Sequence, residues 1–170
     1  MILTGWQRTW IRILTTMLTI AMMIIIFCFS METAEKSDQR SGVYTNFIIS
    51  VIHPEYEQLT PDDQQRIYDS ISMFIRKLAH FTEYTFLGIL LRLCMESWFG
   101  HRKLAAHTLP LISFLAGTFY AATDELHQIL IDGRSGQFVD VLVHACGVLF
   151  GVILGAMLIR HICIKHSNGG

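Results

Sequence analysis

Charged side chains are scarce in this chain. Only 16% of its 170 residues are Asp, Glu, Lys or Arg, whereas a soluble domain carries about 25%. Positive charge is not in excess either, since the net charge is −1, so no basic surface indicates a nucleic-acid partner. Hydrophobic residues are abundant instead, at 52% of the chain, and the mean hydropathy is +0.42. This composition is typical of an integral membrane protein.

Paired cysteines and familiar catalytic motifs are also missing. The four cysteines, Cys28, Cys94, Cys146 and Cys163, form no C-x-x-C pair and show no zinc-finger spacing. Because each lies inside or beside an apolar run, we expect buried thiols and no disulfide. Neither a G-x-S-x-G elbow nor an H-E-x-x-H helix occurs. An enzyme of this sequence would therefore use water or a substrate group as its nucleophile.

Four segments are apolar and long enough to cross about 30 Å of hydrocarbon. They are residues 11–30, 78–99, 107–126 and 139–159. The first, "IRILTTMLTIAMMIIIFCFS", follows the N-terminus as a signal peptide would. Its apolar run is longer than the roughly 7–15 residues of a signal sequence, and no A-x-A-like cleavage site follows. We therefore expect a retained span.

Basic residues set the expected orientation of these spans. They precede the first span, connect the second to the third and follow the fourth, at Arg8, Arg12, His101, Arg102, Lys103, Arg160 and Lys165. In a four-span topology all three positions fall on one side, and the positive-inside rule makes that side the cytoplasm. We predict a multi-pass protein of the bacterial cell membrane with both termini cytoplasmic. Residues 31–76 and 127–138 would then lie outside.

The outer segment 31–76 contains one predicted helix. Thr60, Pro61 and Asp63 resemble a capping box with proline at the first helical position. Apolar residues then recur at helical spacing, at Ile67, Ile71, Phe74 and Ile75. We expect this helix to lie at the outer interface and to run into the second span. The predicted fold is all-α: residues 1–170 form a single membrane domain, a four-helix bundle with an outer interfacial helix before the second span.

Polar residues gather at the predicted outer ends of three spans, in "RKLAHFTEY", "TDELHQ" and "DGRSGQFVD". A helical step of about 100° per residue places the members of each group on a shared face. The groups are Lys77, His80 and Tyr84 with Glu83 at their margin; Tyr120, Asp124, His127 and Gln128; and Asp140, His144, Gly147, Gly151 and Gly155. By the same angles Glu125 points away from the cluster. The glycines form overlapping G-x-x-x-G patterns, which allow helices to approach closely in lipid.

Two acid–histidine pairs lie at matching depths. His80 precedes Glu83 and His127 follows Asp124, each by a step of about 4.5 Å along the helix. Because the two helices are antiparallel, we expect His80 to face His127 and Glu83 to face Asp124. Such pairs resemble part of a di-metal carboxylate site, which makes these four residues weak metal candidates. The full ligand set is not evident, and the sequence identifies no cofactor.

A charge-balanced network is the stronger explanation of the cluster. Basic side chains at Lys77 and Arg134, with Arg76, can neutralise its acids, which are Glu83, Asp124 and Asp140. Unpaired charges at this depth would cost several kcal/mol each. Such a network either locks three helices together or lines a pocket open to the outer leaflet. The turn at residues 132–134 aims Arg134 over the cluster, where its fork suits a carboxylate or an anionic headgroup.

These motifs resemble those of the VanZ-like membrane proteins. The resemblance rests on "RKLAHFTEY", "TDELHQ" and "GRSGQFVDV" followed by Gly147 and Gly151, and on "FS" at 29–30 with Ser37 and Ser41. It covers residues 27–155, most of the chain. The resemblance implies a bacterial multi-span membrane protein, and the named member of the family is associated with low-level resistance to the glycopeptide teicoplanin. It does not supply a biochemical activity.

Two functions follow as hypotheses. The first is a binding protein whose outer-leaflet site takes an amphiphile: a lipid-linked cell-wall precursor, an anionic membrane lipid or a lipoglycopeptide. Its predicted ligand-binding residues are Lys77, His80, Glu83, Tyr84, Asp124, Glu125, His127, Gln128, Arg134 and Asp140. The alternative is an intramembrane enzyme that modifies an outer-leaflet lipid or headgroup. In that case His80 or His127 would act as general base, oriented by Glu83 or Asp124.

A transport function fits less well, because the inner halves of the spans hold few polar residues. Arg92 and Glu96, four residues apart, are expected to form a snorkelling ion pair there with no further role. The polar site is therefore one-sided. The sequence indicates neither the oligomeric state nor the identity of the ligand.

Overall fold

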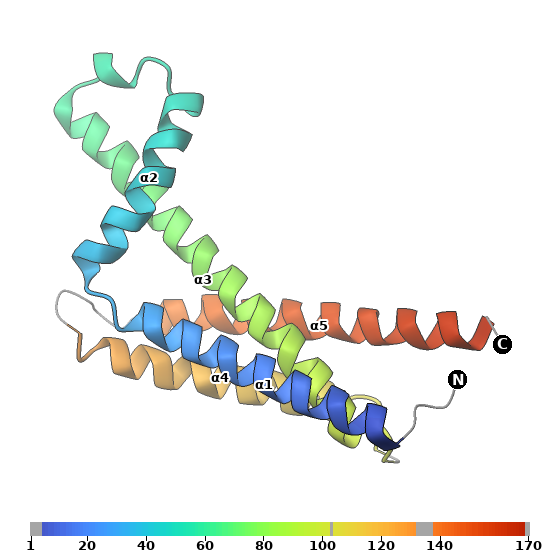
Figure 1. The fold of residues 1–170 in the computed structure, drawn as a ribbon. Coiled ribbons are helices and arrows are strands. Elements are labelled where there is room, and N and C mark those ends of the chain that lie inside the picture. Colours follow the sequence, from blue (N-terminus) through green and yellow to red (C-terminus); the bar gives the residue numbers. More distant parts are fainter. Residues whose placement is uncertain (1–4, 103, 132–137, 169–170) are drawn as a thin grey trace.

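The computed structural model describes residues 5–102, 104–131 and 138–168, and these residues form helices and connecting turns (Figure 1). In chain order the elements are α1 (Gly5–Ser30), α2 (Ala34–Ile52), the 3₁₀ helix η1 (Tyr56–Gln58), α3 (Pro61–Phe99), α4 (Thr108–Gln128) and α5 (Phe138–Asn168). No strand occurs among the described residues. The all-α prediction is confirmed.

Helix α3 organises the fold, because it packs against α1, α2, α4 and α5. Helices α4 and α5 also pack against each other, and α1 contacts α4 along one side (Figure 1). The shared core is apolar and draws on all four bundle helices, at Ile26, Tyr84, Leu87, Leu91, Ala121, Val148 and Val152. Helix α1 begins and α5 ends at the same end of the molecule (Figure 1).

The predicted glycine stripe of α5 forms its contact with α3. A Cβ atom added at Gly147 would lie 2.5 Å from the carbonyl oxygen of Phe81, and one at Gly151 would lie 2.0 Å from that of Thr85. On the facing helix, a Cβ at Gly88 would lie 2.4 Å from the carbonyl oxygen of Val148. These positions admit only glycine at the present spacing, so the backbones of α3 and α5 are in direct contact.

The predicted helix in the segment between the first and second predicted spans is confirmed. It runs into the second predicted span as expected, because α3 continues without interruption for 39 residues from Pro61. No proline or glycine lies between Pro61 and Gly88, so nothing in this stretch breaks the helix. The predicted start is confirmed: the Thr60 hydroxyl oxygen accepts a hydrogen bond of 3.3 Å from the backbone N–H of Asp63.

Helix α2 was not expected from the sequence. It pairs with the N-terminal part of α3, and together they project from one end of the bundle as a helical hairpin (Figure 1). Small polar side chains fill their contact, with the hydroxyl oxygens of Ser41 and Ser72 3.5 Å apart. Asp38 of α2 accepts a hydrogen bond of 2.7 Å from Arg76 of α3. Arg76 therefore ties the hairpin together and does not neutralise the predicted acid cluster.

Two helices of the described chain are long and apolar enough to cross a membrane, Gly5–Ser30 and Phe138–Ile162. They correspond to the first and fourth predicted spans. Only 17% and 33% of their apolar windows are buried, so their hydrophobic side chains mostly face outward. The second and third predicted spans, on α3 and α4, do not meet the same criterion of length and hydropathy. The four-span membrane bundle therefore stays a prediction.

Two of the cysteines also lie on the outward-facing surfaces of these helices. Cys94 is buried as predicted, but Cys28 and Cys146 are exposed, and all three are free thiols. The prediction of buried thiols is wrong for Cys28 and Cys146 because they lie on the outer faces of α1 and α5. The side chain of Cys163 lies outside the described residues.

Candidate functional site

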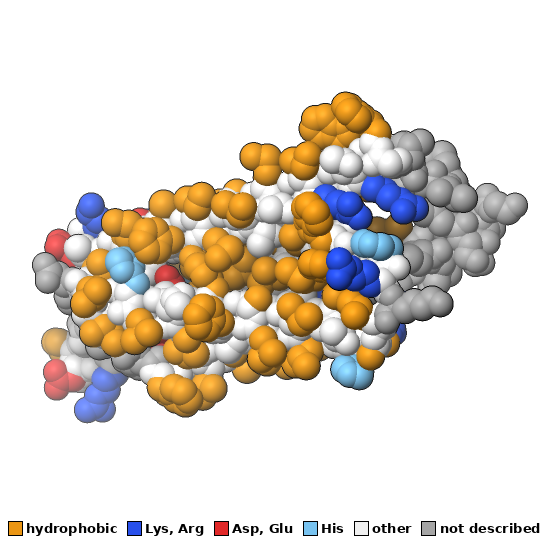
Figure 2. Space-filling model, turned by 90° about the horizontal axis from the view of Figure 1, so that it is seen from below, with side chains coloured by type: hydrophobic (Ala, Val, Ile, Leu, Met, Phe, Trp, Pro, Cys, Tyr) orange, Lys and Arg blue, Asp and Glu red, His pale blue; other side chains and the backbone are white. Residues whose placement is uncertain are grey.

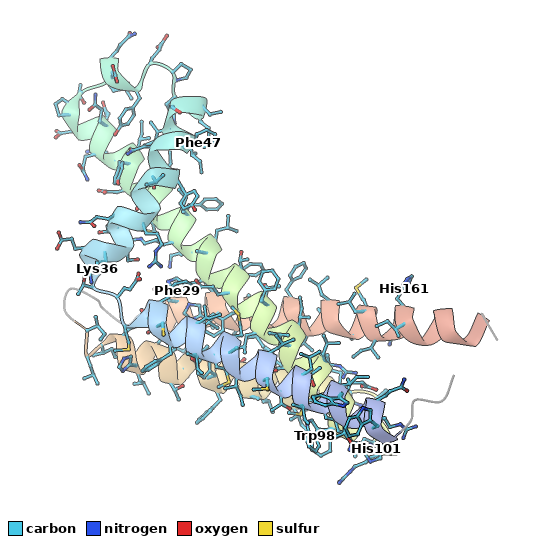
Figure 3. All side chains as sticks on the ribbon, in the orientation of Figure 1. Phe29, Lys36, Phe47, Trp98, His101 and His161 are labelled. Carbon is cyan, nitrogen blue, oxygen red and sulfur yellow. The ribbon has the colours of Figure 1, made fainter. Side chains whose placement is uncertain are left out.

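The predicted polar residues converge at the end of the bundle from which the hairpin projects, the end near Phe29 in Figure 3. Helix α3 contributes its middle, α4 its last turns and α5 its first turns. At the edge of this cluster the ammonium group of Lys77 forms an ion pair with the carboxylate of Asp140. The side chains are 33% and 26% exposed, so water screens the pair in part. Lys77 was predicted to help neutralise the acids of the cluster, and it pairs with one of them, Asp140, which joins α3 to α5.

Asp124 lies deeper, where it is 4% exposed. One of its carboxylate oxygens, Oδ2, accepts hydrogen bonds from the hydroxyl of Tyr84 at 3.1 Å and from the amide of Gln128 at 3.2 Å. Its other oxygen, Oδ1, is buried with no hydrogen-bond partner. Both donors are neutral. The structure thus brings together the predicted residues Tyr84, Asp124 and Gln128, and it leaves the acceptor atom Oδ1 of Asp124 without a donor.

Glu125 does not point away from the cluster, as the helix angles suggested. It is 6% exposed, and its carboxylate oxygen Oε1 lies 3.6 Å from Nδ1 of His144 on α5. The prediction assumed that α4 buries a single face. In fact α4 packs against both α3 and α5, so two adjacent faces are covered. Asp124 uses the first of these faces and Glu125 the second.

His144 stands at the centre of the site, although it was placed only in the α5 stripe and not among the site residues. Its ring is fully buried, stacks on Tyr84 at 4.2 Å between centroids, and meets the His80 ring edge-on at 5.1 Å. Neither ring nitrogen has a hydrogen-bond partner. The signal that could have identified it was present: His144 follows Asp140 by four residues, one turn further into the same face.

His80 and Glu83 form the third part of the site, on α3. Nδ1 of His80 lies 3.4 Å from Oε2 of Glu83, and the two side chains are 28% and 20% exposed. The distance suits an ion pair, but the orientation does not make a hydrogen bond, and Oε2 is buried without a partner. A carboxylate oxygen and an imidazole are thus close together and incompletely satisfied.

The expected pairing of His80 with His127 is not formed. The ring beside His80 is His144, whereas His127 stacks on Phe27 of α1 at 4.9 Å between ring centroids. His127 occupies the side of α4 that faces α1, and its Nε2 atom is buried with no hydrogen-bond partner. Arg134, predicted to reach over the cluster, lies outside the described residues.

The described part of the site is richer in acceptors than in donors. Buried atoms with no hydrogen-bond partner include Oε2 of Glu83, Oδ1 of Asp124, Nε2 of His127 and both ring nitrogens of His144. A buried polar atom without a partner costs free energy, so the site favours a group that donates hydrogen bonds. Among the described residues no three His, Cys, Asp or Glu side chains converge to hold a metal ion. The weak metal candidates gain no support from this geometry.

The predicted ion pair at the opposite end is confirmed in part. Nη1 of Arg92 lies 2.8 Å from Oε2 of Glu96. Arg92 is 7% exposed, however, so its side chain is buried against α5 and does not snorkel outward. A Cβ atom at Gly155 would lie 3.0 Å from Cβ of Arg92, which shows how closely α5 covers it.

Comparison with known proteins agrees with the resemblance that the motifs suggested. A family model described as VanZ/LLP1 matches residues 15–160. Comparisons with curated proteins and with solved structures give no match. The matched range runs from the middle of α1 to the C-terminal half of α5 and contains every described residue of the polar site. The chain therefore belongs to the VanZ/LLP1 family.

Proposed function

We propose that this protein is a multi-span membrane protein that binds the polar headgroup of an amphiphile at the outer leaflet. The headgroup would belong to a lipid-linked cell-wall precursor or to a lipoglycopeptide. The proposal is carried by one observation: the buried, incompletely satisfied polar atoms of Glu83, Asp124 and His144 lie together at one end of an apolar bundle.

The exposed surface of the bundle supports a four-span topology. Helix α4 turns Leu111, Leu115, Phe119 and Leu126 outward, each at least 50% exposed, although its polar C-terminal turns keep its hydropathy low. In water such a surface would be unfavourable by about 25 cal/mol for each Å² of apolar area. In lipid it carries no such penalty. The low hydropathy of α4 therefore comes from the residues that form the site.

The chemistry of the site supports a ligand rich in hydrogen-bond donors. Carboxylates accept hydrogen bonds only, and Glu83 and Asp124 each present a buried oxygen that lacks a donor. Hydroxyl groups of sugars, amides of peptides and ammonium groups supply such donors. Lipid-linked precursors and lipoglycopeptides carry them beside a lipid tail, which the bilayer around the bundle accommodates.

This binding would link the site to antibiotic action. The VanZ-like family is associated with teicoplanin resistance. A protein that holds either the lipid-linked precursor or the drug at the outer leaflet changes how the lipid-tailed drug meets its target at the membrane. We therefore expect protection against teicoplanin and little protection against a glycopeptide that lacks a lipid tail.

The test is a susceptibility measurement in a Gram-positive host that is sensitive to teicoplanin. The wild-type chain is expected to raise the minimal inhibitory concentration severalfold. Glu83→Gln and Asp124→Asn keep the size of the side chain while removing its charge, and they are expected to return the value to that of the empty vector. Asp69→Asn is the matched control, because Asp69 is an exposed acid on the same helix as Glu83.

Expression must be equal for this comparison, which quantification of each variant in the membrane fraction establishes. The binding proposal is wrong if Glu83→Gln and Asp124→Asn, present at wild-type levels, protect as well as the wild type. Equal loss of protection by Asp69→Asn would also count against it, because the effect would then not belong to the site.

A second candidate function rests on the two histidine–carboxylate contacts. His80 with Glu83 and His144 with Glu125 both place an imidazole within 4 Å of an acid. A carboxylate in this position orients the imidazole ring and stabilises the positive charge that the ring acquires when it accepts a proton as a general base. An enzyme of this kind would act on an outer-leaflet lipid or headgroup. Lipid profiles of cells with and without the protein distinguish the two functions, because an enzyme leaves a changed lipid and a binding protein does not.

A further inference from the structure

A second polar recess lies at the opposite end of the bundle, between the start of α1 and the end of α3. It has a volume of about 230 Å³ and is lined by Arg8, Ile11, Arg12, Glu96, Ser97 and His101. Figure 3 shows His101 and Trp98 at this end, far from Phe29 and the acidic site. The recess therefore belongs to neither the candidate site nor the hairpin.

The charge of the recess is positive. Its one acid, Glu96, is already paired with Arg92 at 2.8 Å. Arg12 uses Nε to donate a hydrogen bond of 3.0 Å to the carbonyl oxygen of Ser97, which holds the guanidinium in place. Within the described chain, neither Arg8 nor Arg12 has a carboxylate at ion-pair distance. Two arginines are thus left to balance an anion.

Tryptophans mark this end as a boundary between apolar and aqueous surroundings. All three tryptophans of the chain, Trp6, Trp10 and Trp98, belong to the start of α1 or the end of α3. Each is at least 42% exposed, and the guanidinium of Arg12 lies 5.2 Å from the Trp98 ring centroid. Figure 2 shows several Lys and Arg side chains close together at the right-hand end of a mostly apolar face. Exposed tryptophan beside arginine is the pattern of a membrane interface.

We propose that this recess binds the phosphate of an anionic phospholipid of the inner leaflet. The fixed guanidinium of Arg12 offers its two terminal nitrogens to phosphate oxygens, and Arg8 adds a second positive charge at the rim. The exposed tryptophans beside the recess suit the glycerol level of the same lipid. This inference rests on the membrane topology of the proposed function but not on its outer-leaflet ligand.

The experiment uses the purified full-length chain in detergent and measures lipid adducts by native mass spectrometry. Phosphatidylglycerol is expected to bind with higher affinity than phosphatidylcholine. A basic residue at a membrane surface contributes about 1 kcal/mol to attraction of anionic lipid, so Arg8→Gln and Arg12→Gln should each weaken phosphatidylglycerol binding about fivefold. The matched control is Arg102→Gln, because Arg102 lies at the same end, stacks on Phe99 and does not line the recess.

Arg8→Gln is the decisive variant, because Arg8 is exposed and its substitution leaves the packing of Arg12 on Ser97 intact. Unchanged phosphatidylglycerol binding by Arg8→Gln would overturn the proposal. So would equal binding of phosphatidylglycerol and phosphatidylcholine by the wild type.

A competition arm with inorganic phosphate identifies the source of the phosphate. Displacement of the lipid at millimolar phosphate would mean that the recess is a general anion site and not a lipid site. Because the readout is lipid binding by purified protein, it does not depend on teicoplanin protection. The two proposals can therefore fail separately.

Discussion

Replacing Gly151 with alanine tests the contact on which the site depends. The added Cβ atom would lie 2.0 Å from the carbonyl oxygen of Thr85 and 2.9 Å from the backbone nitrogen of Ile89. Ordinary van der Waals contact begins near 3.4 Å, and both atoms belong to the backbone of α3. Neither can rotate away, so α3 and α5 must separate.

Two opposing effects set the magnitude. Overpacking a tight contact costs about 1–3 kcal/mol, and a clash with backbone belongs at the upper end of that range. Alanine is about 1 kcal/mol better than glycine inside a helix. The clash is the larger effect, so we expect a net destabilisation of about 2 kcal/mol. For a chain of this length that corresponds to a lowering of the unfolding temperature by roughly 4–8 °C.

The detergent-purified protein is heated and then run on size-exclusion chromatography. The assay measures the temperature at which half of the monodisperse peak is lost. Gly155→Ala should lower it less, because the nearest atoms to its added Cβ, Cβ and Cγ of Arg92, lie 3.0 and 3.1 Å away, whereas that of Gly151→Ala meets backbone at 2.0 Å. Gly5→Ala is the control, since nothing lies within 4 Å of its added Cβ atom, and it should leave the temperature unchanged or slightly higher. An unchanged or raised temperature for Gly151→Ala would refute the close contact of α3 and α5.

Four further substitutions test three polar contacts by the same thermal measurement. Tyr84→Phe removes the buried donor to Asp124, and loss of a hydrogen bond to a charged acceptor should cost about 1.5–3 kcal/mol; full wild-type stability would contradict that bond. Lys77→Met and Asp140→Asn, combined in a double-mutant cycle, should show a coupling energy of at most about 1 kcal/mol, because their ion pair is partly exposed. Additive effects of the two substitutions would mean that the two groups do not interact. Arg76→Gln breaks a pair with side chains 39% and 54% exposed, so a change above about 1 kcal/mol would show that the hairpin depends on it more than the geometry indicates.

The helices of the bundle could be predicted because their signals are local. Apolar runs of sufficient length placed all four bundle helices, and Thr60 with Pro61 placed the start of α3. Helix α2 was missed because its apolar residues, among them Val43, Phe47 and Val51, stand exposed on one side and its other side is polar. Its contact with α3 rests mainly on small polar residues, so the apolar stripe of α2 lies on the side away from α3 and does not mark the contact.

The sequence by itself determined that polar groups from three helices meet at one end of an apolar bundle, because membrane-length runs and chain direction fix which helix ends lie together. It also placed the glycines of α5 on a single face. It did not determine the partners within the cluster. Helical angles give the direction in which a side chain projects from its own helix, but they do not identify the residue of a neighbouring helix that it contacts.

Only the tertiary structure decided those partners. Because α4 packs against α3 and α5 and also contacts α1, Glu125 is buried beside His144 and His127 faces Phe27. The position of α5 against α3 likewise puts His144 next to His80. Which acid meets which histidine depends on how far each helix is rotated and how closely it approaches, and those quantities are set by packing across the whole bundle.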